Sequence, residues 1–173
     1  MISFETVTAT WKNIGQMSMD EAESLAAQMN TEQPIALYYL LSLQDMPFTT
    51  AEHELIHYVG IVVWQIMLHS DQQLYHVTEE SLERAQEANA RLLDQLASSS
   101  GPEFVAACQR LIRTHPEPEV LRYIVETLVT AESEDFPGRP ALRAEAQGMA
   151  FIQLKILLDA MVACLGPRPP LVA

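Results

Sequence analysis

Residues 49–59 read Thr-Thr-Ala-Glu-His-Glu-Leu-Ile-His-Tyr-Val, and this stretch decides the fold class because it joins a helix start to a long apolar continuation. Thr49 stands three residues before Glu52, which is the spacing of a capping box, where each side chain accepts a hydrogen bond from the other residue's backbone N–H. The residues that follow, to about His69, are mostly apolar and lack strand-like alternation. The stretch therefore predicts a long helix that is buried on most of its surface.

Helix-start signals and helical periodicity extend over nearly the whole chain. Ser18 precedes Glu21 and Thr78 precedes Ser81 at the capping spacing, and Pro34 and Pro102 stand where further helices begin. The helices expected from these signals cover residues 18–30, 35–43, 49–69, 78–97, 103–113, 114–133 and 141–165. The sequence therefore predicts an all-α protein, a compact helical bundle of about seven to eight helices.

The helix start at Thr49 has a counterpart later in the chain. Residues 114–124 read Thr-His-Pro-Glu-Pro-Glu-Val-Leu-Arg-Tyr-Ile and keep the threonine, both glutamates and the tyrosine. Alignment of residues 34–98 with residues 99–163 gives ten identities, against about four or five expected from composition. We therefore predict one domain over 1–173 that contains two three-helix repeats. Its expected divisions are N-terminal helices over 1–33, a first helical unit over 34–98, a second unit over 99–165 and a proline-rich tail over 166–173.

Composition narrows the class of partner and the compartment. The chain has 23 acidic and 10 basic side chains and a formal net charge of -13, so its field repels phosphate backbones and anionic lipid. We expect neither nucleic acid nor a membrane as a partner.

The longest apolar run, Leu55 to Leu68, is shorter than a bilayer span of roughly 20 residues. Cys108 and Cys164 lie in apolar helical patterns outside any CxxC motif, which predicts free thiols and a cytoplasmic protein.

The same stretch that starts the long helix also contains a candidate metal site. His53 and His57 are four residues apart, so they lie on one face of the helix and could bind one metal ion, and Glu54 could act as general base on a metal-bound water. In this spacing the segment resembles the HExxH signature of zinc metallopeptidases, which implies a zinc-dependent hydrolase. Gly60 continues the resemblance toward the metzincin pattern, but the position of the third metzincin histidine is Val63.

A zinc site would need a third ligand from another helix. We expect the helix after residues 71–77 to return antiparallel past His53 and His57, which makes Asp94 the best candidate ligand. The alternative is that Asp94 accepts a hydrogen bond from His57 or pairs with Arg91.

The Glu-x-x-His spacing of Glu54 and His57 also matches half of a di-iron carboxylate bundle site. The repeat-equivalent positions are Glu119 and Arg122, and arginine does not bind iron. A di-iron protein is therefore a second alternative.

The histidines are not part of what repeats, since His53 corresponds to Pro118 and His57 to Arg122, whereas the acidic residues of the helix start are kept. Acids in a first helical turn have a structural role, because they complement the helix dipole and its free N–H groups. The main prediction is therefore a protein without a cofactor that acts as a protein-interaction or assembly module, with a protein partner or a second copy as its ligand. The zinc hydrolase and the di-iron protein remain the alternatives.

Overall fold

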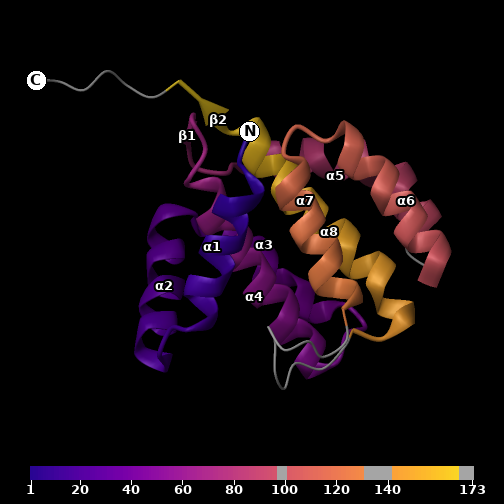
Figure 1. Ribbon diagram of the computed structural model, residues 1–173, viewed down its shortest axis with the longest axis horizontal. Helices are drawn as coiled ribbons and strands as arrows, with labels where there is room; N and C mark the ends of the chain where they lie inside the picture. Colours follow the sequence, from indigo (N-terminus) through magenta and orange to yellow (C-terminus); the bar gives the residue numbers. More distant parts are fainter. Residues whose placement is uncertain (97–100, 131–141, 168–173) are drawn as a thin grey trace, which may run out of the picture.

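A computed structural model describes residues 1–96, 101–130 and 142–167 of the chain. Over these ranges the protein is a bundle of eight α-helices with one pair of very short strands (Figure 1). The elements are α1 (Phe4–Gly15), α2 (Met19–Glu32), α3 (Pro34–Ser42), the 3-10 helix η1 (Leu43–Asp45), α4 (Thr50–Met67), β1 (Gln73–Leu74), α5 (Glu79–Leu96), α6 (Gly101–Thr114), α7 (Pro118–Val129), α8 (Ala144–Ala163) and β2 (Leu165–Gly166). The prediction of an all-α helical bundle is confirmed. The predicted helix break around Phe136 and the tail beyond Pro167 lie outside the described residues.

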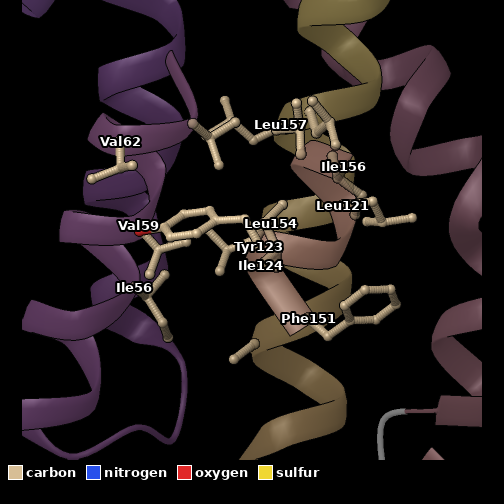
Figure 2. Close-up of a cluster of buried hydrophobic side chains, with 14 of the residues drawn as sticks. Ile56, Val59, Val62, Leu121, Tyr123, Ile124, Phe151, Leu154, Ile156 and Leu157 are labelled. Atoms are coloured by element: carbon tan, nitrogen blue, oxygen red, sulfur yellow. The ribbon is translucent and has the colours of Figure 1, made fainter. Parts of the chain in front are cut away.

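Helix α8 is the central helix of the bundle, and it packs against α4, α5 and α7. Its residues are apolar on nearly every side, which is the pattern of a helix enclosed by others. Figure 2 shows the layer in which α4, α7 and α8 meet, with Tyr123 of α7 pointing toward Val59 of α4. On the opposite side of α8, the ring of Phe151 meets Phe104 of α6 edge-on, with ring centroids 5.7 Å apart. The core is thus continuous from α4 to α6 through α8.

Among the described helices, α8 is the one whose length and apolar composition would also suit a membrane span. Within the protein, 67% of that stretch is buried against the other helices. A core helix of a bundle passes the same test of length and composition.

Three predicted helix starts are confirmed in atomic detail. Thr49 and Glu52 form a reciprocal capping box, with the Thr49 N–H donating to Glu52 at 2.8 Å and the Glu52 N–H donating to Thr49 at 3.2 Å. Ser18 and Glu21 form the same arrangement at the start of α2. Before α5, the backbone N–H groups of Thr78 and Ser81 each donate to the other residue's hydroxyl, at 3.1 Å.

The fourth predicted start, at Thr114, is wrong. Thr114 is the last residue of α6, and α7 begins at Pro118 without a side-chain cap. The carboxylate of Glu117 accepts a hydrogen bond from the backbone N–H of Ile2 at 2.8 Å, so it binds a distant segment instead of its own helix start. Shared residue types therefore perform different tasks at the two positions.

The two predicted repeat units are not confirmed as equivalent. Helix α7 packs along α8 in the second unit, whereas α4 and α5, their counterparts in the first unit, are not a closely packed pair. The lengths also differ, since α3, α4 and α5 have 9, 18 and 18 residues while α6, α7 and α8 have 14, 12 and 20.

The short strand pair explains why α5 packs against α8 and not against α4. β1 and β2 pair antiparallel, with Gln73 opposite Gly166 and Leu74 opposite Leu165, and the Tyr75 N–H donates to the carbonyl of Cys164 at 3.0 Å. This clip carries the chain from the end of α4 to the end of α8. Helix α5 then starts beside the C-terminal end of α8 and packs along it, so the expected return of this helix past α4 is wrong.

Candidate functional site

The HExxH-like segment occupies the first three turns of α4, which the capping box starts. The ring of His53 lies edge-on to Phe48, with centroids 5.4 Å apart, and the His53 and His57 rings have centroids 6.4 Å apart. Both histidines are half-buried, whereas Glu54 is exposed on the helix surface. The helix therefore brings the two histidines to one face as the sequence predicts, with the glutamate between them directed to solvent.

One ring nitrogen of His57 is engaged with α3. His57 Nε2 lies 2.8 Å from the carbonyl oxygen of Leu40, and because a carbonyl can only accept, this nitrogen carries the proton and donates. A metal at Nε2 would have to break this bond. The bond also shows that α3 covers this face of α4.

Asp94 does not belong to this neighbourhood. It is an exposed residue of α5, the helix that packs on α8, and His57 bonds the Leu40 carbonyl instead. Within the described ranges, no group of three or more His, Cys, Asp or Glu side chains is placed to hold a metal ion. The structure thus brings His53 and His57 together but does not add Asp94 to them.

The carboxylate that does bond a histidine is Asp159, which the alignment of the two halves places opposite Asp94. Asp159 Oδ1 lies 2.9 Å from His115 Nε2, and Oδ2 accepts from Lys155 at 2.6 Å and from Asn89 at 2.7 Å. Asn89 also donates to the carbonyl of Ala85 at 2.8 Å. This network joins α5, the α6–α7 turn and α8. The sequence offered a signal for part of it, because Lys155 and Asp159 are four residues apart on one helix.

Both nitrogens of His115 are used inside the protein. Nδ1 accepts from the backbone N–H of Glu117 at 3.0 Å, so the proton of the neutral ring is on Nε2 and is donated to Asp159. Burial raises the pKa of Asp159, but the hydrogen bonds from His115, Lys155 and Asn89 outweigh it and hold this pKa below its ordinary value. The network has the geometry of a structural tie, with no ring nitrogen left for a substrate.

A second tie joins the first turns of α4 and α8. Arg143 Nε donates to Glu52 Oε1 at 2.8 Å and its Nη2 donates to Oε2 at 2.9 Å, while the Arg143 backbone N–H donates to Oε1 at 3.1 Å. Only 4% of the Glu52 side chain is exposed. The hydrogen bonds from Arg143 lower the pKa of Glu52 from 4.5 to about 2 in spite of burial. Sequence reasoning found Glu52 as a cap but missed Arg143, which lies 91 residues away.

The least expected surface is the outer side of α3. This helix contains no charged residue and is apolar around its whole circumference, yet Tyr38 is 72% and Leu41 46% exposed. Ile35 and Leu37 beside them are half-buried and packed against the core. These four residues, which we call the α3 face, border a shallow hollow of about 430 Å³.

The opposite side of α3 is fixed in the core. Ala36, Tyr39 and Leu40 are buried, and the Tyr39 hydroxyl donates to the side-chain carbonyl of Gln153 on α8 at 2.6 Å. The orientation of the helix is therefore set, and the α3 face is what remains directed outward.

Both cysteines are free thiols, as predicted. Cys108 is fully buried, and its burial raises the pKa of the thiol to about 12, so this thiol is protonated at neutral pH. Cys164 is half-buried at the end of α8. Neither belongs, among the described residues, to a group of three or more His, Cys, Asp or Glu side chains that could hold a metal ion.

Comparison with known proteins adds no relative. The chain matches no protein-family model, no curated protein and no solved structure.

Proposed function

We propose that the protein is a non-catalytic interaction module that assembles into a homodimer through the α3 face. The observation that carries the proposal is the exposure of Tyr38 and Leu41, 72% and 46%, on a helix without a charged residue. Neighbouring large apolar side chains that remain exposed commonly mark an interaction surface. A tyrosine is well suited to such a surface, because its ring provides apolar contact area at low conformational cost.

Charge supports a second copy as the occupant of the α3 face. Each chain carries a formal charge of -13, so two copies repel one another and can meet with least repulsion where the surface is uncharged. The four side chains of the α3 face are uncharged, and among the described residues the one acidic side chain that lines their hollow is Glu79 of α5. In a two-fold dimer both copies contribute the same surface to the interface. Tyr38 of one copy would then lie against Tyr38 of the other.

The state of the polar groups supports a non-catalytic role. A general acid or base needs a position from which it can reach a substrate. His115 uses both ring nitrogens internally, Glu52 is held by Arg143, and Asp159 is held by three donors.

Sedimentation equilibrium of the purified chain over a range of concentrations tests the proposal. We expect a dimer for the wild type and a monomer for Tyr38→Lys, because a lysine at the two-fold contact places two like charges in an apolar interface. The matched control is Met19→Lys, which changes the net charge equally at a side chain 77% exposed on α2, and it should still dimerise. A wild type that stays monomeric at every concentration, or a Tyr38→Lys variant that dimerises as well as the control, would overturn the proposal.

A further inference from the structure

The groove between α6 and α7 combines an apolar floor with arginines. It has a volume of about 360 Å³, and its apolar lining consists of Val105, Ile112, Val125 and Val129. The polar residues on its walls are Gln109, Arg113, Arg122 and Glu126. α6 and α7 follow one another in the sequence and pack on each other. The two walls of the groove are therefore held together by helix packing.

The charge around this groove differs from that of residues 1–96. Residues 1–96 contain fourteen acidic and three basic side chains, whereas residues 101–130 contain four acidic and three basic ones. Two of those four acids are engaged, because Glu117 is buried against the first residues of the chain and Glu119 pairs with Arg122 at 3.4 Å. The α6–α7 hairpin is therefore much less acidic than residues 1–96, and the acid that remains on the wall of the groove is the exposed Glu126.

The two groove arginines are available to a partner. Arg122 keeps 45% of its side chain exposed beside Glu119, and its guanidinium has more donors than one carboxylate oxygen uses. Arg113 is exposed in the last turn of α6, where a cation also suits the helix dipole. No ion pair of Arg113 is found among the described residues. The dipole of α6 accounts for Arg113. It does not account for Arg122, which lies on α7 at the border of the same apolar groove.

We propose that the α6–α7 groove docks an acidic amphipathic peptide segment of another protein. The apolar side chains of such a segment would cover the valines of the floor, and its carboxylates would pair with Arg113 and Arg122. Helical and extended segments with apolar anchors are the usual occupants of grooves of this kind. Arginine forms two parallel hydrogen bonds with a carboxylate, which fixes the register of the segment. This surface is distinct from the α3 face and does not depend on dimer formation.

Selection from a display library of random linear peptides tests this inference, with the purified Tyr38→Lys chain as bait to keep the α3 face out of the experiment. We expect recovered peptides that are rich in Asp and Glu and that alternate acidic with apolar positions. Their affinity should fall about tenfold or more in Arg113→Glu/Arg122→Glu. The matched control is Arg84→Glu/Arg91→Glu, which makes the same charge change on α5, and its affinity should stay close to that of the bait.

The outcomes separate the two proposals. Recovered peptides without acidic enrichment, or peptides that bind both charge-reversed variants equally, would overturn the inference, as would the absence of any binder. None of these results bears on the dimer, which the sedimentation experiment tests alone.

Thermal unfolding followed by circular dichroism should show equal folding of both charge-reversed variants, because all four arginines are exposed. If only the groove variant were unfolded, Arg113→Gln/Arg122→Gln replaces it in the same comparison, and unchanged binding there would equally overturn the inference.

Discussion

Glu52, Glu117 and Asp159 are acidic side chains that each bind a segment distant in the sequence. Glu52 binds Arg143, Glu117 binds the backbone of Ile2, and Asp159 accepts from Asn89 and His115. A hydrogen bond to a charged group contributes about 1.5–3 kcal/mol, more than one between neutral groups. In a chain with so many acids on its surface, a small number of carboxylates thus determines how helices are joined.

The Glu52–Arg143 pair predicts a pH-dependent difference in stability. Because the pKa of Glu52 is about 2 in the folded protein against an ordinary 4.5, its charged form stabilises the fold fully above pH 4.5 and loses this effect as the pH falls toward 2. We expect Glu52→Gln to lower the free energy of unfolding by about 1–3 kcal/mol at pH 7. The difference from the wild type should shrink below pH 4.5.

Denaturant unfolding at several pH values measures this effect, with Glu54→Gln as control. Glu54 is exposed two residues further along α4, and its variant should remain within about 0.5 kcal/mol of the wild type. A Glu52→Gln effect that was equally large at pH 3 and pH 7 would contradict the assignment to charge.

The surroundings of His53 and His57 on α4 lead to a prediction about how much metal the purified protein binds. Since the described residues place no third His, Cys, Asp or Glu side chain with His53 and His57 to hold a metal ion, we expect the protein, purified without a histidine tag, to carry far less than one zinc, iron or manganese per chain. Elemental mass spectrometry of the wild type and of His53→Ala/His57→Ala should give the same values. Near-stoichiometric metal that disappears in the variant would instead establish the zinc or di-iron alternative.

At the scale of elements, the helix starts could be predicted from the sequence while their packing partners could not. Thr49 with Glu52, and Ser18 with Glu21, act within one turn of chain, so a spacing of three residues is sufficient information. The placement of α5 depends on a clip between residues about ninety apart, and no local pattern records it. The same limit explains the candidate site: His53 and His57 share a face by helical geometry alone, but whether Asp94 joins them depends on the path of the chain.

The contact between α3 and α4 is close enough to predict the effect of a single methyl group. A Cβ atom on Gly60 would lie 2.6 Å from both terminal carbons of Leu40, and Leu40 is only 1% exposed. We expect Gly60→Ala to destabilise the protein by about 1–3 kcal/mol, although alanine is intrinsically the better helix former by about 1 kcal/mol.

A double-mutant cycle separates these two effects. In a Leu40→Ala background the overlap is removed, so Gly60→Ala should become neutral or stabilising in denaturant unfolding. Gly15→Ala serves as control, because its Cβ would meet only the Tyr58 hydroxyl, at 3.8 Å. An equal cost of Gly60→Ala in both backgrounds would show that the Leu40 contact is not the cause.

At the scale of the whole molecule, the fold class followed from helical periodicity and the internal arrangement did not. The ten identities between residues 34–98 and 99–163 include Glu52 opposite Glu117 and Asp94 opposite Asp159. The Glu52 side chain caps α4 whereas the Glu117 side chain makes no capping hydrogen bond, and Asp94 is exposed whereas Asp159 binds three donors. The same residue type at aligned positions therefore has different surroundings in the two halves, because neighbours from other parts of the chain determine those surroundings.

The pairing of α5 with α8 has a consequence for how the protein is made. Asn89 on α5 reaches its partner Asp159 across 70 residues of chain, and translation at about 5–20 residues per second needs several seconds to supply them. During that interval the apolar side of α5 has emerged from the ribosome while the helix that will cover it does not yet exist. The nascent chain therefore passes through a stage at which Leu82 and Ala85, buried in the finished protein, are open to chaperones, and α5 is covered only after α8 has been synthesised.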